Sequence, residues 1–332
     1  MLVERNKDLD FVGGILICHM ILGHICQWAD MDYKGDCVLY FFMPWFFYKS
    51  GMFFKKNSDW REQLRKDAHH LLIPFLVFSA IGQIFLWINL FAKGDMNWLH
   101  YVSFPKWLLL NGSIPANSPL WFLLSLFIVK IIYNAVSNRI SNIYIIVIAL
   151  GVAFIDNYSG IDAPYYLANS ALGLVFFILG SRMKILQYNK YVVLIAAFSY
   201  TISIVFPSSI GMLNNVLVRG HCYLLATVYA LAGIIVINKV AQITPPPRFY
   251  NTLIIIGLCN IGRNSMNYYI IHWIILMIVK TIVIDTLHIE ENSSIYFFAL
   301  LVTCAVVLPT LSHTLNKLNN TKFRILLGKK WK

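Results

Sequence analysis

Apolar runs about as long as a lipid bilayer is thick recur throughout this chain, and they limit what it can fold into. A helix that rises about 1.5 Å per residue needs about 17 to 25 residues to cross a hydrocarbon core of roughly 30 Å. Hydrophobic residues make up 58% of the chain and charged residues only 13%, too few polar side chains to cover a soluble domain. We therefore expect an all-α polytopic membrane protein with about ten transmembrane helices, at residues 11–28, 37–54, 71–92, 119–136, 142–156, 165–181, 191–207, 222–238, 265–284 and 294–313.

Two apolar segments differ from an ordinary span. The first run follows a mixed-charge segment and lacks an A-x-A-like cleavage site, so we expect a retained helix rather than a signal peptide. The stretch at 254–262 is too short to cross a bilayer. We expect it to be re-entrant or interfacial and to lead into the ninth span.

The distribution of basic residues predicts the orientation. With a cytoplasmic N-terminus, 20 of the 27 Lys and Arg residues fall in cytoplasmic segments and only 4 in outer segments. We therefore expect cytoplasmic N- and C-termini. This asymmetry accounts for most of the net charge of +12, and no basic module interleaved with aromatic residues indicates nucleic-acid binding.

The chain is expected to form one membrane domain over residues 1–332, with a basic tail at about 314–332. The outer segment 93–118 is rich in aromatic residues, which suits an interfacial belt or stacking against sugar rings. Six cysteines include no C-x-x-C pair, so no zinc or redox motif is present. Cys37 and Cys222 both fall near the outer face and could pair in an oxidising compartment, or both could remain free thiols.

Three histidines are the ionisable residues expected deep in the membrane. Lys49, Lys130 and Lys280 lie near span ends and can reach the interface, and no carboxylate pair lies within a span. The deep residues are His19, His24 and His272.

His24 is expected about 20 Å from the inner face, and it lies about 140° around the helix from His19, so at most one of them faces a given cavity. A neutral imidazole is a plausible general base. The alternative is a structural histidine that donates to a carbonyl of a neighbouring helix.

Five segments resemble, in order, motifs of the membrane acyltransferase 3 family. LDFVGGILICHMILGH at 9–24 resembles the family's opening helix, an apolar run that ends in a histidine. FFMPWFFYKSGMFFKK at 41–56 is similar to its Phe-His-Met-Pro-Leu-Phe-Phe-Phe-x-Ser-Gly motif. IGRNSMNYYIIH at 261–272 is similar to its Gly-x-Asn-Ser-Leu-x-Ile-Tyr-x-x-His motif. Shorter resemblances lie at 69–79 and 118–127.

The resemblance implies an integral-membrane O-acyltransferase of a bacterial inner membrane. Such an enzyme moves an acetyl group from acetyl-CoA, its co-substrate, to a hydroxyl of a cell-surface glycan or its precursor. Its partners would be the acyl-CoA donor, a carbohydrate acceptor and the bilayer, with no nucleic acid, no metal and no permanently bound cofactor. By resemblance His24 is catalytic, and it would accept the hydroxyl proton or relay the acyl group.

Further roles are implied around His24. Supporting or substrate-binding roles fall to Asp10, Trp121, Asn264, Ser265 and His272. The CoA phosphates would be held by Lys55, Lys56, Arg61, Arg65 and Arg263, with Lys66 in the same cluster. We expect the thioester to arrive from the cytoplasm and to extend toward His24, and the acceptor to approach from the outer side.

The local chemistry leaves some points open. No carboxylate is placed to orient His24, so a neutral group such as Gln83 or Asn267 is expected to do so. We also expect Pro44 to kink the second span, and Ser50 and Gly51 to allow close packing against the first.

The chain departs from the family pattern at three positions. Gly13 replaces an expected Arg or Lys, Phe42 an expected His, and His70 an expected Arg. These losses keep a non-catalytic member of the same fold open as an alternative. A polytopic glycan transporter or flippase is another alternative, although no repeat of the two halves is visible.

Overall fold

The computed structural model describes residues 6–55, 59–95, 97–158, 164–183, 188–206, 223–243, 252–318 and 327–328. All regular structure in these residues is helical. The elements are α1 (Lys7–Trp28), α2 (Asp36–Leu39), α3 (Phe42–Met52), α4 (Trp60–Asp67), η1 (Ala68–Leu72), α5 (Ile73–Ala92), α6 (Trp98–Val102), α7 (Phe104–Asn111), η2 (Pro115–Leu120), α8 (Trp121–Val136), α9 (Asn142–Tyr158), α10 (Tyr165–Arg182), α11 (Lys190–Val205), α12 (Tyr223–Ile243), α13 (Leu253–Arg263), α14 (Ser265–Lys280), η4 (Thr281–Thr286) and α15 (Ser294–Leu318).

The helices make this chain a membrane protein. In the described residues, six helical stretches are long and apolar enough to cross a bilayer: Lys7–Trp28, Trp60–Ala92, Phe104–Val136, Leu224–Ile243, Ser265–Thr286 and Ser294–Leu318. The other apolar helices are shorter, and they are Asn142–Asp156, Tyr166–Arg182, Lys190–Val205 and Leu253–Arg263. The count of ten spans and the cytoplasmic termini therefore stay predictions.

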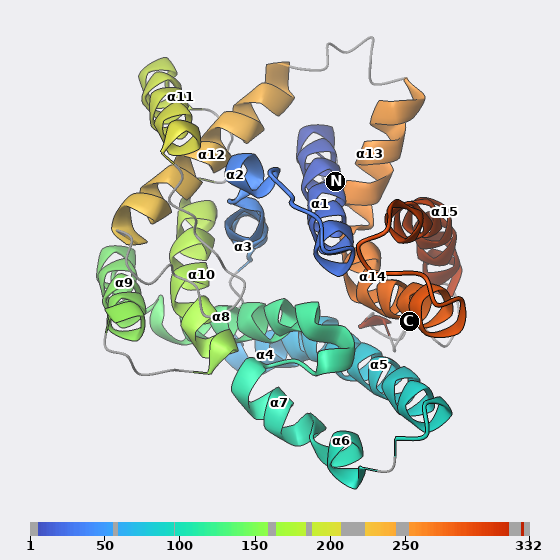
Figure 1. Cartoon of the computed structure of the whole chain (residues 1–332). Helices are drawn as coiled ribbons and strands as arrows, with labels where there is room; N and C mark the ends of the chain where they lie inside the picture. The colour runs from blue at the N-terminus through green and yellow to red at the C-terminus, as the bar shows by residue number, and fades with distance from the viewer. Residues whose placement is uncertain are drawn as a thin grey trace.

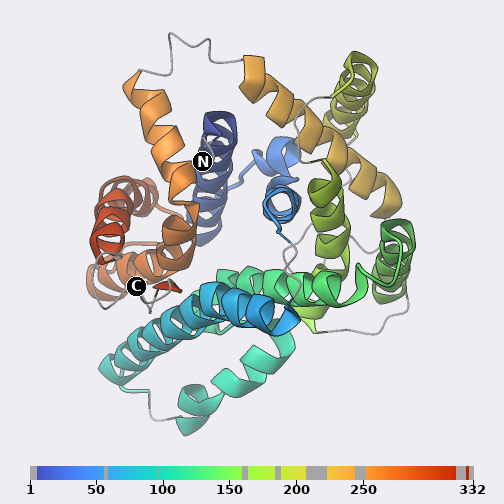
Figure 2. The same cartoon turned by 180° about the vertical axis from the view of Figure 1, so that it is seen from behind.

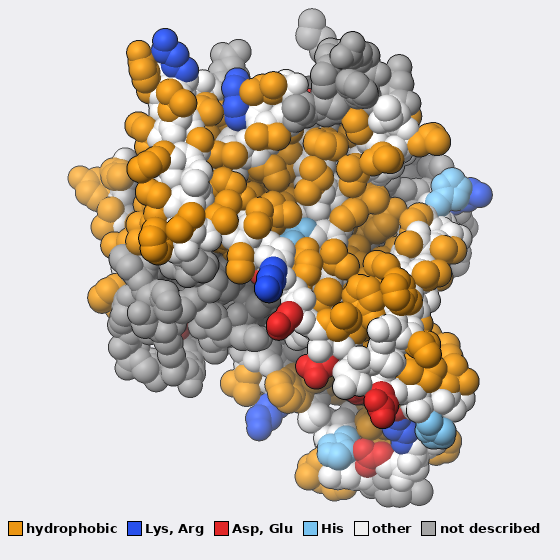
Figure 3. All heavy atoms as spheres, turned by 45° about the horizontal axis from the view of Figure 1, so that its top comes forward, with side chains coloured by type: hydrophobic (Ala, Val, Ile, Leu, Met, Phe, Trp, Pro, Cys, Tyr) orange, Lys and Arg blue, Asp and Glu red, His pale blue; other side chains and the backbone are white. Residues whose placement is uncertain are grey.

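The surface matches this assignment. Figure 3 shows one face on which hydrophobic side chains predominate and charged side chains are few. On α11, for example, Leu194, Ile195 and Phe198 are each at least 65% exposed. Contiguous apolar surface of this kind is stable only against lipid or another apolar partner.

The expected second span, 37–54, is a broken segment. The chain turns at Tyr40 and Phe41, and α3 is only 11 residues long, about 16 Å. Pro44 stands in the first turn of α3 and therefore does not kink it, because the missing N–H would have no intrahelical partner there. The expected span is interrupted just before Pro44, at Tyr40 and Phe41, and is not kinked at the proline itself.

Helix α3 lies at the middle of the bundle, between α1 on one side and α10 on the other (Figures 1 and 2). Its aromatic side chains are buried except for Phe46, which is half-buried, and polar atoms of this segment find partners on outer helices. The indole of Trp45 donates to the Asn238 side chain of α12 at 2.9 Å, and the Tyr40 hydroxyl just before α3 donates to Ser203 of α11 at 3.0 Å.

Glycines set the two closest helix contacts. A Cβ on Gly51 would lie 2.0 Å from the Phe177 carbonyl oxygen, and one on Gly180 would lie 2.0 Å from the Tyr48 carbonyl oxygen, so α3 and α10 touch backbone to backbone. We had expected Gly51 to pack against the first helix. It packs against α10 instead. In the same way Gly14 meets Leu258, and Gly262 meets Asp10. The short segment at 254–262 is therefore part of a helix, α13, that packs along α1.

Candidate active site

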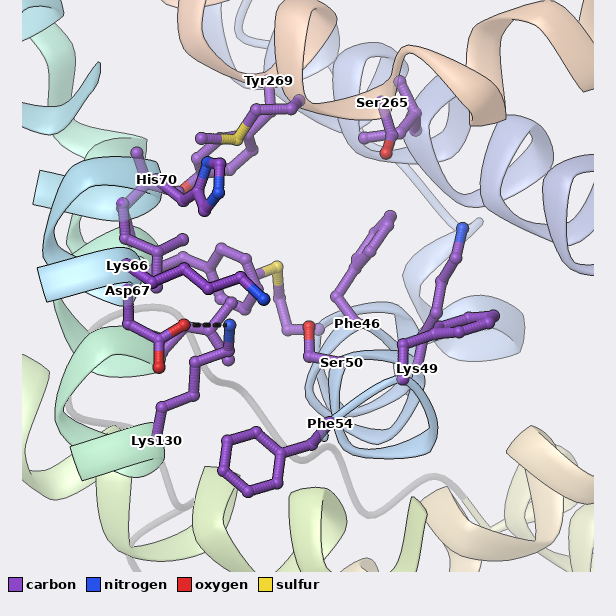
Figure 4. Close-up of a pocket in the computed structure, with 18 of the residues that line it drawn as sticks. Phe46, Lys49, Ser50, Phe54, Lys66, Asp67, His70, Lys130, Ser265 and Tyr269 are labelled. Atoms are coloured by element: carbon purple, nitrogen blue, oxygen red, sulfur yellow. Dashed lines mark hydrogen bonds and ion pairs between the residues drawn. The ribbon is translucent and has the colours of Figure 1, made fainter. Parts of the chain in front are cut away.

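A cavity of about 590 Å³ lies between α1, α3, α4 with η1, α8 and α14 (Figure 4). Basic side chains stand on several sides of it, so we name it the cationic cavity. Apolar side chains form much of its remaining wall. Its lining consists of Ile17, Met20, Met43, Phe46, Lys49, Ser50, Phe53, Phe54, Lys55, Gln63, Lys66, Asp67, His70, Leu71, Phe122, Leu123, Leu126, Lys130, Ser265, Met266 and Tyr269.

One buried acid partly balances the charge of this cavity. Asp67 pairs with Lys130 at 2.9 Å and accepts from the Gln63 side-chain amide at 2.6 Å. In Figure 4 the Lys66 side chain extends from the same wall toward the open centre, and the His70 ring lies above it. The carboxylate fixes Lys130, while Lys66 presents its charge to the cavity. Anions and an apolar chain could both be accommodated here.

Lys49 reaches the cavity from the opposite wall. Its ammonium donates to the Leu9 carbonyl at 3.4 Å and lies over the Trp45 ring at 5.0 Å. A Cβ on Gly13 would be 3.2 Å from the Lys49 ammonium nitrogen. Gly13 stands where the family pattern has an Arg or Lys. In the structure it borders the ammonium group of Lys49, which comes from α3.

The second cavity, of about 290 Å³, lies further along α1, and we name it the histidine cavity. Its lining mixes His24 with polar groups from α1, from the loop after it and from α2. The residues are Met20, Gly23, His24, Gln27, Met31, Tyr33, Asp36 and Phe42.

His24 is hydrogen bonded to His272 in the packed core. The distance from His24 Nδ1 to His272 Nε2 is 2.9 Å, and the planes of the two rings differ by 13°. Both residues are buried, at 6% and 0% exposure. The rings of Trp273 and His24 pack in a T-shaped arrangement, with their centroids 5.1 Å apart. The two histidines, 248 positions apart in sequence, thus form one unit.

The hydrogen bonds determine where the protons lie. His272 Nδ1 faces the carbonyl oxygens of Tyr269 and Tyr268, at 2.8 and 3.2 Å, and carbonyls only accept, so Nδ1 carries the proton. With both rings neutral, His272 Nε2 then accepts the proton of His24 Nδ1–H. This leaves the lone pair on His24 Nε2, which makes no hydrogen bond within the described residues. The arrangement can take up a proton at His24 Nε2.

The helix that carries His272 is held from behind by η2. Asn117 donates to the Ile270 carbonyl at 3.1 Å, the Tyr269 hydroxyl donates to the Pro119 carbonyl, and the Trp273 indole donates to the Pro115 carbonyl at 3.3 Å. These bonds link η2, the short 3-10 helix that leads into α8, with residues 269–273 of α14, the stretch that contains His272.

A family model for an acyltransferase domain, acyltransferase 3, matches residues 6–313, essentially the whole chain. The chain belongs to the acyltransferase 3 family. Neither the curated proteins nor the solved structures include one that matches this acyltransferase. Its membrane-spanning helices and its family together make it a membrane-bound acyltransferase.

His19 stands apart from the hydrogen-bonded pair of His24 and His272. Its Nδ1 lies 2.8 Å from the Tyr33 hydroxyl, and its Nε2 lies 3.3 Å from an Asp36 carboxylate oxygen without hydrogen-bond alignment. Burial, together with the neighbouring Asp36 carboxylate, raises the pKa of the Tyr33 hydroxyl, which is therefore a neutral group. His19 fixes the loop that closes one side of the histidine cavity.

Of the other expected supporting residues, only Ser265 lies at a cavity. Ser265 lines the cationic cavity. Asp10 is buried in the first turn of α1 against Gly262, Trp121 is buried at the start of α8, and Asn264 accepts from Asn316 of α15 at 2.9 Å. None of these last three lines either cavity.

The neutral groups suggested to orient His24 lie elsewhere. Asn267 donates to Ser312 and Asn316, and the Gln83 side-chain oxygen has no hydrogen-bond partner within the described residues. The orienting group is His272.

Only some of the basic residues expected to bind the CoA phosphates lie at a cavity. Lys55 lines the cationic cavity, as does Lys66 of the same cluster. Arg61, Arg65 and Arg263 are exposed and line neither cavity, and Lys56 lies outside the described residues, as does Cys222.

The sequence did not reveal that Lys49 and Lys130 line a cavity, because lysines near span ends were expected only to reach the membrane interface. Both face the cationic cavity, together with His70. The available signal was their position: each lies near the same expected inner end of a span as the basic cluster of residues 55–66.

Proposed function

We propose that this membrane acyltransferase is an O-acetyltransferase that moves an acetyl group from acetyl-CoA to a hydroxyl of a cell-surface carbohydrate or its precursor, in a bacterial inner membrane. The observation that carries the proposal is the His24–His272 hydrogen bond, which leaves a base at His24 Nε2 beside a polar cavity and close to a cationic one. The acyl donor would occupy the cationic cavity and the acceptor the histidine cavity.

The chemistry of CoA supports the first assignment. Its phosphates are anions, and Lys49, Lys55, Lys66 and Lys130 surround the cationic cavity. The apolar wall formed by residues such as Phe46 suits the pantetheine arm and the thioester. The volume of about 590 Å³ lies in the usual range for small-molecule sites, about 300 to 1,000 Å³.

The chemistry of a sugar hydroxyl supports the second assignment. Gln27, Tyr33 and Asp36 give the histidine cavity an amide, a neutral phenol and a carboxylate. Such groups bind neighbouring hydroxyls by donating and accepting in turn. Gln27, at least, follows His24 by about one helical turn, so a bound sugar would place a hydroxyl near His24 Nε2.

The transfer then needs only groups that are present. His24 Nε2 takes the proton of the acceptor hydroxyl while the oxygen attacks the thioester carbonyl. His24 becomes an imidazolium that still donates from Nδ1 to His272 Nε2, and the carbonyls of Tyr268 and Tyr269 hold His272 in place. The carbon–sulfur bond breaks, the ester remains on the acceptor, and the CoA thiolate recovers the proton from His24.

Acetyl transfer in isolated membranes tests the proposal. Membranes with wild-type or His24→Ala protein receive radiolabelled acetyl-CoA and a surface-glycan extract from the host. We expect alkali-labile label on the glycan with the wild type and none with the variant, at equal protein levels. Full labelling by His24→Ala would contradict the role of His24. Failure of the wild type to label glycan from a panel of hosts would contradict the carbohydrate acceptor.

A further inference from the structure

Met20 separates the two cavities. Along α1, Ile17 lines only the cationic cavity, Met20 lines both, and His24 lines only the histidine cavity. The same division occurs at the start of α3, where Met43 faces the first cavity and Phe42 the second. Met20 is 4% exposed, so its side chain is buried where the two cavities meet. The wall between the cationic cavity and the histidine cavity is thus formed by the flexible side chain of Met20, with Phe42 on the side of the histidine cavity.

We propose that Met20 sets the length of the acyl chain that the enzyme transfers, an inference that rests on the proposed function. A thioester carbonyl that comes from the cationic cavity must pass Met20 to reach His24, which lies one turn further, about 6 Å along the helix axis. The carbons beyond the carbonyl must then fit against the Met20 side chain. An acetyl group adds a single methyl there, and each further methylene competes with the thioether for space.

The chemistry of methionine suits such a wall. Its side chain is unbranched and adaptable, so it can move for a small acyl group and still close the gap behind it. Shortening it to alanine would join the cavities into one channel. One methylene in an apolar pocket changes selectivity by about 10- to 200-fold, so the loss of the thioether should be measurable.

The test compares acetyl-CoA, propionyl-CoA and butyryl-CoA as donors for wild type and Met20→Ala. We expect the butyryl-to-acetyl ratio of kcat/KM to rise about tenfold or more in Met20→Ala. Met20→Leu, of similar volume, should keep the wild-type ratio. Ile21→Ala is the matched control, because Ile21 is its buried neighbour on α1 and lines neither cavity. Its ratio should not change.

If Met20→Ala does not fold, a second variant can still test the proposal. Met20→Phe should bind acetyl-CoA as the wild type does but transfer acetyl at least about tenfold more slowly. An unchanged donor ratio in Met20→Ala, an equal change in Ile21→Ala, or wild-type transfer by Met20→Phe would overturn the role of Met20. Failure of the wild type with all three donors would instead overturn the proposed function, so the two failures are distinguishable.

Discussion

Replacing His272 with phenylalanine should slow catalysis and leave acetyl-CoA binding unchanged. His272 Nε2 accepts from His24 Nδ1 at 2.9 Å in the buried core. Phenylalanine fills the ring space but has no lone pair, and a buried N–H without a partner costs about 1–3 kcal/mol. His24 can avoid that cost by moving its proton to Nε2, which removes the base. We therefore expect kcat to fall by about 10²- to 10⁴-fold, the usual contribution of general-base catalysis.

The assay is release of the CoA thiol in the presence of acceptor, with kcat and KM measured separately. Since His272 lines neither cavity, KM for acetyl-CoA should not change. His272→Gln is the matched control, because its side-chain oxygen can accept near the position of Nε2, and it should recover part of the rate. A wild-type kcat for His272→Phe would refute the reasoning. So would a glutamine variant as slow as the phenylalanine variant, because packing would then be the role.

Two further predictions concern the helix contacts and the cationic cavity. Gly262→Val should abolish the monodisperse folded protein in detergent size-exclusion chromatography, because even a Cβ would lie 1.8 Å from the Asp10 carbonyl oxygen, whereas Gly257→Val on the same helix has open space and should be tolerated. Lys66→Gln should raise KM for acetyl-CoA by about tenfold in steady-state kinetics, and less at high salt, with little change in kcat. Arg61→Gln, outside the cavity, should leave KM unchanged, and equal effects of the two substitutions would contradict the assignment of the cavity.

Apolar patterning predicted where most helices lie. The expected span 142–156 is α9, Asn142–Tyr158, and the expected span 294–313 is contained in α15, Ser294–Leu318. Composition could show this because a segment must satisfy its own backbone hydrogen bonds in lipid, and an apolar helix does so. The same rule failed for 37–54. There the neighbouring helices supply an enclosed, protein-lined environment, so the chain can turn at Tyr40 and α3 can be short.

The sequence identified the histidines of the candidate site but not the contact between them. Depth in the membrane singled out His24 and His272 one at a time, but their hydrogen bond depends on the packing of α1 against α14, across 248 positions. From the sequence we therefore expected Gln83 or Asn267 to orient the His24 ring. In the structure His272 does so through its hydrogen bond. Lys49 and Lys130 were set aside because a snorkelling lysine and a cavity-lining lysine have the same sequence signature near a span end.

Sealed vesicles test the proposed function most directly, because with the expected orientation the thioester arrives from the cytoplasmic side and the acceptor approaches from the outer side. Vesicles of defined orientation carry glycan acceptor inside and receive radiolabelled acetyl-CoA outside. We predict labelled acceptor within inside-out vesicles of the wild type, little in right-side-out vesicles, and none with His24→Ala. Labelling only when donor and acceptor share a side, or undiminished labelling by His24→Ala, would contradict the account.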